Sequence, residues 1–218
     1  MIADAKTEVA TTNKRNYAYS IAKLWLEGNM GKQAKTLTTH ELRRVLDYIA
    51  TRNHAARNRA MLLMTYYAGL RVGEVAALRY ADVVADNGSI KPEIVLRPEQ
   101  TKGRHARTVF LGERVRKELL TYVQAHRQTD TRKPLFSTQK TEGWTANTLC
   151  QHFFHLYKRA GITGASSHSG RRTFITTLAS KGVGVRVLMS LAGHRNISTT
   201  QTYIDVNDAM MRSAVELV

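Results

Sequence analysis

Residues 54–78 read HAARNRAMLLMTYYAGLRVGEVAAL and predict a helix, a tight turn and a second helix. The largely apolar run over residues 55–67 is typical of a buried helix. Gly69 suits the position just after the helix end, because glycine adopts a positive φ without strain. Residues 74–78 then begin a short second helix. We expect this arrangement to present the Arg71 side chain in a fixed direction.

Amphipathic helices are expected on both sides of this stretch. Thr38 and Glu41 have the spacing of a capping box, and apolar residues then recur at helical period, which predicts a helix of about 12 residues. Residues 112–128 and 145–160 show the same period. The last of these carries His152 and His155, which we interpret as helix-face histidines. A metal site is the alternative, but no carboxylate or cysteine of matching spacing accompanies them.

Two runs rich in β-forming residues, 90–97 and 107–111, lie between the helical segments. A proline and a glycine occur in the residues that separate them, so the pattern predicts an antiparallel pair with Lys102 in its loop. Arg104 and Arg107 extend this basic loop and could contact a phosphate backbone. The predicted fold class is mainly α with a small antiparallel β-sheet (α+β).

The charge of the chain points to a polyanion as partner. Its 33 Lys and Arg against 17 Asp and Glu leave a formal net charge of +16 over 218 residues. An excess this large favours nucleic acid. Charge alone does not separate DNA from RNA or from an anionic membrane, but the basic residues are interspersed, which favours a folded basic surface over a basic tail.

Cysteine usage and hydropathy limit the class of protein further. Cys150 is the only cysteine, so no intrachain disulfide can form. No signal-like apolar segment follows Met1, and no apolar run approaches the length needed to span a bilayer. We therefore expect a protein of the reducing cytoplasm, with no membrane partner.

The second half of the chain contains a histidine and an arginine at helical spacing. Ser167 is a plausible N-cap for a helix that begins HSGRRTFITTL at residue 168. A spacing of three places His168 and Arg171 on one face of the first turn, where free N–H groups and the helix dipole favour an anion. Alone, this pair is a weak signal.

A tyrosine follows a second histidine near the carboxy end. A helix over residues 185–191 is expected to end at Gly193 and deliver His194, and residues 198–200 can cap a last short turn that holds Tyr203. A phenol ionises only near about pH 10, so a tyrosine nucleophile needs nearby cations or a base. The histidines and arginines of this chain could meet that need.

Five motifs follow one another in a fixed order: AGLRVGE (68–74), TKGR (101–104), HSGRR (168–172), LAGH (191–194) and, nine residues after His194, Tyr203. In this order the chain resembles the tyrosine recombinases, also called the phage integrase family, over roughly residues 38–205. The resemblance implies an α-rich catalytic domain with a small antiparallel sheet. It also implies DNA strand cleavage through a 3′-phosphotyrosyl intermediate and rejoining by a 5′-hydroxyl, without a metal or a nucleotide cofactor.

The resemblance assigns a role to each member of the set. Tyr203 would be the nucleophile, and Arg71 and Arg171 would hold the non-bridging phosphate oxygens in the fork geometry of a guanidinium. Lys102 would protonate the departing 5′-oxygen. The remaining members would be His168, which assists proton transfer, His194, which hydrogen-bonds the phosphate, and Glu74, which supports the site. Candidate contacts to DNA are Arg104, Arg107, Arg172 and Arg195.

Two positions depart from the family pattern. Gly170 stands where the family usually has leucine, and Arg172 stands where it often has a second histidine. We expect the glycine to loosen the start of its helix, at about 1 kcal/mol relative to alanine. Neither change removes a member of the catalytic set.

The expected domain organisation has three parts. Residues 1–35 would form an N-terminal arm, partly ordered or disordered, residues 36–205 the catalytic domain, and residues 206–218 a tail helix that docks on a neighbouring subunit or packs in cis. Only 37 residues precede Thr38, so we expect a short single-domain member, similar to those that invert fimbrial promoters, or a fragment. Expected partners are double-stranded DNA, other copies in a tetramer on DNA, and accessory DNA-bending proteins, in a prokaryotic or mobile-element setting.

Three function classes stay open at this point. A site-specific recombinase of the integrase or invertase type comes first. A type IB topoisomerase-like enzyme uses similar chemistry but would relax non-specific supercoiled DNA as a monomer. A non-catalytic DNA-binding regulator on the same fold would lose nothing when Tyr203 is replaced by phenylalanine.

Overall fold

The computed structural model describes residues 33–126, 128–138, 141–204 and 208–216. The chain divides into two compact units, Met1–Gln33 and Ala34–Val218, and every element named below belongs to the second. The arm expected over residues 1–35 lies almost entirely outside the described residues.

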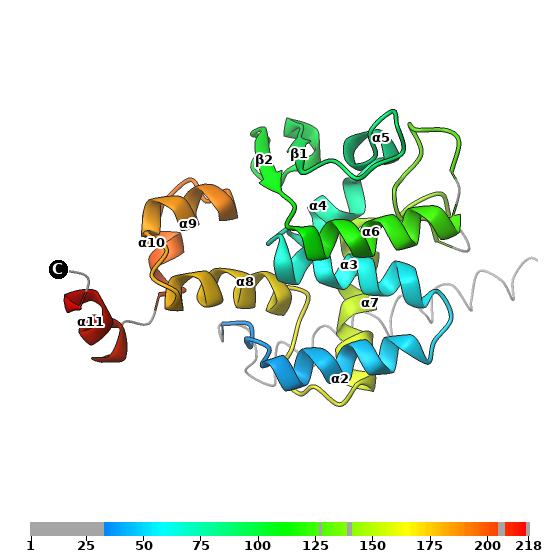
Figure 1. Cartoon of the computed structure of the whole chain (residues 1–218). Helices are drawn as coiled ribbons and strands as arrows, with labels where there is room; N and C mark the ends of the chain where they lie inside the picture. The colour runs from blue at the N-terminus through cyan, green and yellow to red at the C-terminus, as the bar shows by residue number, and fades with distance from the viewer. Residues whose placement is uncertain (1–32, 127, 139–140, 205–207, 217–218) are drawn as a thin grey trace, which may run out of the picture. The chain divides into compact units, whose positions relative to one another are not determined.

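The described residues form mainly helices (Figure 1). Up to the end of the sheet the elements are α2 (Thr39–Ala50), α3 (Ala55–Tyr67), α4 (Val72–Ala77), α5 (Tyr80–Val83), β1 (Glu93–Leu96), the 3₁₀-helix η1 (Pro98–Gln100) and β2 (Arg107–Phe110). After the sheet come α6 (Glu113–His126), α7 (Ala146–Arg159), α8 (Ser169–Ser180), α9 (Val185–Ala192), α10 (Ile197–Gln201) and α11 (Asp208–Val215). This composition confirms the expected fold class.

Helix α3 is the centre of the core. It packs against α2, α6 and α8, and its residues 61–64 are almost completely buried. It ends as predicted, because Gly69 has φ +65 and the Leu70 N–H donates to the Met64 carbonyl. A Cβ on Gly69 would also lie 2.4 Å from the Phe174 ring. The position therefore requires glycine both for its positive φ and for the close approach of Phe174.

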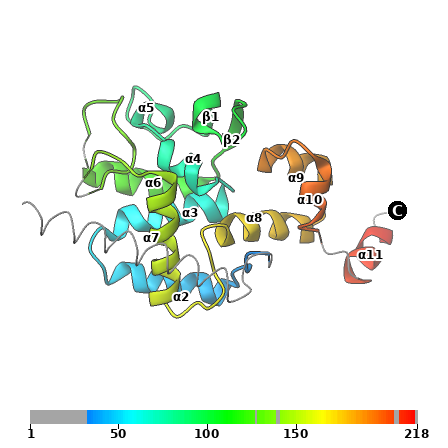
Figure 2. The same cartoon turned by 180° about the vertical axis from the view of Figure 1, so that it is seen from behind.

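Helix α2, which packs on α3, begins where local capping predicts. Thr38 and Glu41 form the predicted capping box, and α2 buries its apolar face. Seen from behind (Figure 2), α7 passes across the body and contacts both α2 and α4. Within the described parts of the chain, no helix is long and apolar enough to cross a membrane.

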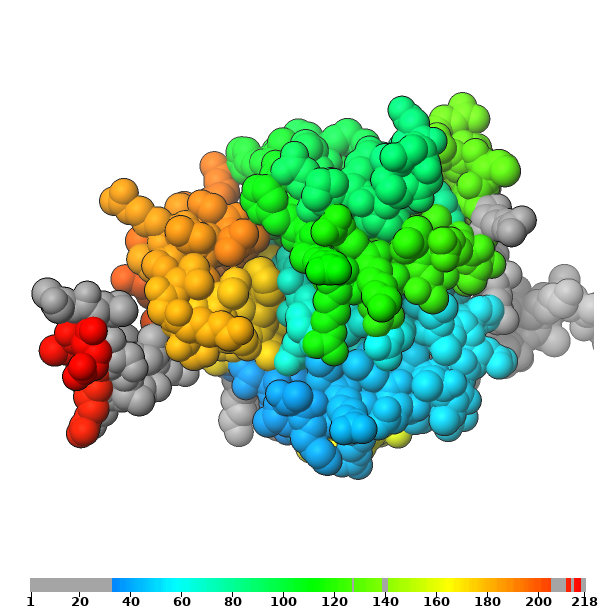
Figure 3. All heavy atoms as spheres, viewed as in Figure 1, coloured from blue at the N-terminus to red at the C-terminus, as the bar shows by residue number. Residues whose placement is uncertain are grey.

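The two strands pair antiparallel, with Glu93 opposite Phe110 and Leu96 opposite Arg107. Ile94 and Val109 face the core. The loop between the strands carries Lys102, as predicted. In the space-filling view (Figure 3) the β1–β2 segment and the α9–α10 segment meet on one face of the molecule.

Two helix starts differ from the sequence prediction. Helix α8 begins at Ser169, with His168 at the N-cap rather than Ser167, because a turn closed by the Ser169 N–H and the Ser166 carbonyl delays the first helical residue. Helix α10 is capped by Asn196, whose Oδ1 accepts from the Ser198 N–H at 2.9 Å. Tyr203 therefore lies just beyond α10.

Gly170 does more than lower helix propensity. A Cβ at this position would lie 2.3 Å from Thr65 Oγ1 and 3.1 Å from Thr65 Cβ. The glycine therefore lets the first turn of α8 approach α3 closely. The packing of α8 against α3 at this point therefore opposes the loosening expected from helix propensity alone.

Candidate active site

Arg71 stands at the N-cap of α4 and is held by Glu74 of the same turn. The Glu74 carboxylate accepts from the Arg71 backbone N–H at 2.8 Å and from its Nη1 at 2.9 Å. The Arg71 Nη2 donates to the Gly193 carbonyl at 3.1 Å. The Arg71 side chain is 24% exposed, so it is fixed from one side and open on the other.

Arg107, the first residue of β2, binds the same carboxylate. Its Nε and Nη2 donate to Glu74 at 3.2 and 2.6 Å, and its Nη1 donates to the Leu191 carbonyl at 2.9 Å. The side chain is only 10% exposed. This interior position differs from the exposed loop position that the sequence suggested. The two-residue period of β2 could have shown it, because Arg107 and the buried Val109 share a face.

Glu74 is 1% exposed and carries the negative charge of this group. Burial by itself raises the pKa of Glu74, but the hydrogen bonds and charges of Arg107 and Arg71 outweigh burial and hold the pKa below its usual value. Glu74 is therefore ionised and fixes two guanidinium groups from different parts of the chain.

Arg171 is the most deeply buried of the candidate cations, at 5% exposure. Its Nη1 donates to the Gly69 carbonyl at 2.5 Å, and its Nη2 contacts the Ala192 carbonyl and, at 3.0 Å, the Nε2 of His194. Both carbonyls lie at helix ends, where acceptors lack helical partners. Burial and the charge of Arg71 lower the pKa of Arg171, and Tyr203 is close enough to act in the opposite direction.

The tautomer of His194 follows from its two partners. A guanidinium can only donate, so Nε2 accepts from Arg171. Nδ1 then carries the proton and donates to Thr200 Oγ1 at 2.9 Å. Burial, with the charges of Arg171, Arg71 and Arg107, lowers the pKa of His194 to about 4, so the imidazole is neutral at neutral pH.

Gly193 links these groups through the backbone. It ends α9 with φ +59, as the sequence predicts, and its carbonyl accepts from Arg71. A Cβ at Gly193 would lie 2.4 Å from the Cδ of Arg107. The position therefore requires glycine both for its backbone angle and for the passage of Arg107.

Tyr203 lies against His194. The two rings stack, with centroids 5.7 Å apart and an interplanar angle of 20°. The guanidinium carbon of Arg172 lies 5.5 Å from the Tyr203 ring centroid. Tyr203 is half-buried, so its ring is positioned by two basic side chains without being enclosed.

A cavity of about 550 Å³ separates the β1–β2 loop from the α9–α10 turn. Arg71, Lys102, His194 and Arg195 line it, together with Arg107. Lys102 and Arg195 are exposed, and so is Arg104, which has φ +51 in the same loop. Five of the candidate residues thus line an open cleft.

Arg171, Tyr203 and His168 do not form the wall of this cavity. Arg171 and Tyr203 lie behind this wall, where each contacts His194, which lines the cavity. His168 stands exposed at the start of α8. Partial burial and the charges of Arg171, Lys102 and Arg71 lower the pKa of His168, which places it within the same field of positive charge.

His152 and His155 lie outside this site. The His152 ring packs 4.9 Å from Trp144, and burial lowers its pKa to about 4. Among the described residues, no group of three or more His, Cys, Asp or Glu side chains is placed to hold a metal ion.

Comparison with known proteins gives the family. A match to the phage integrase family covers residues 35–210. The tyrosine recombinase XerA of Thermococcus kodakarensis is 32% identical over 185 residues, which are 84% of this chain and 62% of the relative. The tyrosine recombinase XerD of Neisseria meningitidis is 30% identical over 170 residues, 75% of this chain and 55% of the relative. The chain spans less than two thirds of the length of these curated relatives.

Solved structures share the fold. The crystal structure of XerA recombinase matches with a TM-score of 0.67 and 26% identity over 85% of this chain and 66% of that one. XerH site-specific recombinase bound to its difH substrate matches with a TM-score of 0.64 and 22% identity, over 85% of this chain and 55% of that one. Because the family match extends over most of the chain, this protein belongs to the phage integrase family.

Proposed function

We propose that this chain is the catalytic part of a site-specific DNA recombinase of the integrase or invertase type, which cuts and rejoins strands through a 3′-phosphotyrosyl intermediate. One observation carries the proposal. The Tyr203 ring stacks on His194, and His194 is hydrogen-bonded to the buried Arg171 beside a cationic cleft. A phenol, an imidazole and guanidinium groups from distant segments therefore meet at one place.

Arg71 and Arg171 are the proposed phosphate clamp. A guanidinium has five N–H donors. Arg71 uses two of them on Glu74 and Gly193, and Arg171 uses three on Gly69, Ala192 and His194. Donors are left on both groups for non-bridging oxygens. Since their positions are fixed before substrate binds, they can stabilise the charge that builds at phosphorus without reorganisation.

The proposed chemistry balances without an outside reactant. The Oη of Tyr203 attacks phosphorus, an O–P bond forms and the bond from phosphorus to the 5′-oxygen breaks. The phenol proton passes to the neutral imidazole of His168, and Lys102 gives a proton to the leaving 5′-oxygen. Rejoining reverses each transfer. The phosphotyrosine keeps the bond energy, so the proposal includes no metal and no nucleotide cofactor.

His194 needs a rearrangement to act as a donor to phosphate. In this structure its Nε2 accepts from Arg171. Donation from Nε2 to a phosphate oxygen requires the proton to sit on Nε2, with the Arg171 N–H turned to the phosphate instead. We therefore expect substrate binding to break the hydrogen bond between Arg171 and His194 and to change the tautomer of His194.

Double-stranded DNA is the proposed partner, and a tetramer on DNA the proposed assembly. Lys102 and Arg195 are exposed and line the cleft, Arg104 is exposed in the same loop as Lys102, and all three support contact with a DNA backbone. We also propose that the catalytic domain extends over residues 36–205 and that residues 206–218 dock on a neighbouring subunit. Met211 and Val215 of α11 are 53% and 72% exposed, which supports the docking prediction.

Strand-trapping DNA tests the proposed nucleophile. Nicked fragments from the source replicon release a short end after cleavage, so a covalent adduct accumulates. We expect an SDS-resistant adduct with the native sequence and none with Tyr203→Phe. Tyr67→Phe is the matched control, because Tyr67 is also half-buried but lies in α3, and it should keep the adduct.

Three other outcomes would change the proposal. An adduct on Tyr203→Phe would exclude Tyr203 as the nucleophile. Tight DNA binding without any adduct would favour a non-catalytic regulator. Relaxation of non-specific supercoiled DNA by the monomer would favour a type IB topoisomerase-like enzyme.

A further inference from the structure

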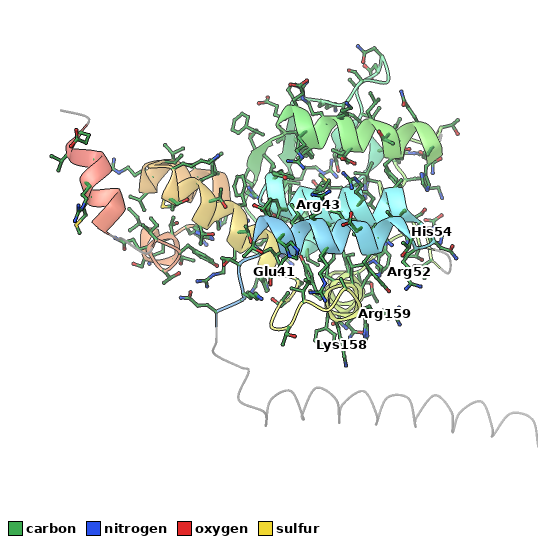
Figure 4. All side chains as sticks on the ribbon, turned by 60° about the horizontal axis from the view of Figure 1, so that its bottom comes forward. Glu41, Arg43, Arg52, His54, Lys158 and Arg159 are labelled. Carbon is green, nitrogen blue, oxygen red and sulfur yellow. The ribbon has the colours of Figure 1, made fainter. Side chains whose placement is uncertain are left out.

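A second cationic cavity lies where α2 ends and α3 begins, beside the carboxy-terminal half of α7. Its volume is about 370 Å³. Three arginines and three histidines line it, and its wall contains no Asp or Glu: the six are Arg52, Arg57, Arg159, His54, His152 and His155. Figure 4 shows Arg52, His54 and Arg159 gathered near the end of α2. The cavity therefore concentrates positive charge without an internal counter-ion.

Arg57 is the buried member of this group, at 7% exposure. Its Nη1 donates to the Ser137 carbonyl at 2.7 Å, and its other contacts are long hydrogen bonds of 3.4 Å to Asn58 and the Trp144 ring at 5.3 Å. None of these partners is negatively charged. A buried guanidinium without an anion is costly, which makes an external anion favourable here.

The amino end of α3 adds first-turn N–H donors at the same place. His54 occupies the N-cap with φ +61 and gives no side-chain cap, and the first turn contains no acidic residue. The N–H groups of this turn and the helix dipole both favour an anion. Since α3 is 13 residues long, the dipole at its end is fully developed.

The rim is open and its charges are available. Arg52 and Arg159 are exposed, and within the described part of the chain neither forms an ion pair. The buried Nε2 of His152 also lacks a hydrogen-bond partner there. The basic side chains at the rim and in the wall therefore face a space whose lining contains no carboxylate.

We propose that this cavity binds a phosphate group, with Arg57 at its base, Arg52 and Arg159 at its rim, and the first-turn N–H groups of α3 beside them. From Arg57 to its end at Tyr67, α3 is roughly 15 Å long at 1.5 Å per residue, and the two cavities share no lining residue, so the site is distinct from the candidate active site. The phosphate can come from a DNA backbone or from a free phosphorylated molecule. Phosphate binding here does not depend on the proposed recombinase activity.

Titration of the full chain with inorganic phosphate, at ionic strength held constant with sodium chloride, tests the proposal. Histidine ring resonances in NMR spectra report on the two sites separately. We expect saturable shifts of His54 and His152 that follow one dissociation constant. A double variant with both Arg52→Ala and Arg159→Ala should weaken this binding roughly tenfold, because two charge-assisted contacts are lost.

A matched pair controls for general electrostatics. Arg43→Ala and Lys158→Ala remove the same charge from α2 and α7, and neither side chain lines the cavity. Figure 4 shows Arg43 away from the end of α2 where Arg52 lies. This pair should change the dissociation constant less than about twofold. Equal losses in the two pairs, or no saturable shift of His54 and His152, would overturn the proposal.

Duplex DNA distinguishes the two sources of phosphate. Binding of a fluorescent duplex, followed by anisotropy, should weaken more in the Arg52/Arg159 pair than in the Arg43/Lys158 pair if the cavity takes a backbone phosphate. Equal DNA affinities, together with loss of inorganic phosphate binding, would assign the cavity to a free phosphorylated ligand. Because this readout needs no strand cleavage, it is independent of the Tyr203→Phe experiment.

Discussion

Two buried arginines of this protein, Arg107 and Arg57, are stabilised in different ways, whereas Arg171 of the candidate active site resembles Arg57 in contacting only uncharged groups. In the candidate active site, Arg71 and Arg107 share the buried carboxylate of Glu74. In the cavity of α2, α3 and α7, Arg57 is buried to a similar extent but meets only uncharged partners. The first arrangement fixes guanidinium groups with an internal anion, whereas the second leaves the anion to be supplied from outside.

Whether a buried guanidinium has a carboxylate partner decides whether it is better suited to holding a fixed position or to binding an external anion. A guanidinium held by an internal carboxylate is fixed before substrate arrives, which suits catalysis because no reorganisation is needed. A guanidinium without a carboxylate has lost its hydration and gains most from an external anion. Arg107 is therefore suited to positioning, whereas Arg57 and Arg171, which contact no carboxylate, are suited to binding an external anion.

The largest expected effect comes from removing the internal anion. Glu74→Gln leaves Arg71 and Arg107 without their carboxylate, and we expect the free energy of unfolding to fall by about 3 to 5 kcal/mol. Glu118→Gln is the control, because Glu118 binds Arg59 in a two-pronged pair that is partly exposed. It should cost less than about 1 kcal/mol. Urea unfolding measures both, and equal losses would remove the distinction between the buried and the exposed pair.

The next prediction compares Arg107, which has a carboxylate partner, with Arg57, which has none. Arg107→Met should cost roughly 3 kcal/mol, because Glu74 keeps only Arg71. Arg57→Met should change stability by less than about 1 kcal/mol in phosphate-free buffer, since it removes an uncompensated charge and one carbonyl contact. The same urea experiment checks both variants. A large loss in Arg57→Met would show that an internal partner compensates this guanidinium.

A backbone change in the active-site region should have a smaller effect. Gly193→Ala combines a strained positive φ with a contact 2.4 Å from Arg107, and we expect a loss of roughly 2 to 3 kcal/mol. Gly182→Ala isolates the backbone cost, because Gly182 has φ +79 and nothing within 4 Å of its Cβ position. It should lose about 1 kcal/mol. If thermal unfolding gave the same loss for both, the contact with Arg107 would contribute nothing.

A further expected effect is a dependence of stability on pH, which develops gradually as the pH falls. The pKa of His194 and of His152 is lowered from 6.5 to about 4, one in each region. Between these values the unfolded chain binds more protons, so stability should fall as the pH drops from 6.5 toward 4. The contribution of Glu74, whose pKa is lowered from 4.5, is present above pH 4.5 and is lost only as the pH falls further.

Unfolding free energies across this pH window provide the check. His194→Asn should flatten the dependence that comes from the active-site region, and His152→Asn the dependence that comes from the second cavity. A stability that does not change between pH 6.5 and 5 would contradict the burial of neutral histidines in both regions.

Much of the fold could be predicted because its signals are local. The capping box of Thr38 and Glu41 and the glycine ends at Gly69 and Gly193 depend on residues a few positions apart, and the strand pair joins segments that follow each other along the chain. The start of α8 differs from the prediction because of a local turn at Ser166–Ser169, and that of α10 because Asn196 caps the helix. Gly170 shows the limit of propensity, since its close approach to Thr65 involves a different helix.

By itself, the sequence determined the family, the order of the helices and the set of ionisable groups that could meet. Only the tertiary structure decided which groups are partners. It joined Arg107 to Glu74, 33 residues apart, Arg71 to Gly193 and Arg171 to the ends of two helices, and it left Arg57 without an anion. The physical reason is that capping and periodicity act between neighbouring residues, whereas the partner of a buried guanidinium depends on which surfaces the hydrophobic core brings together.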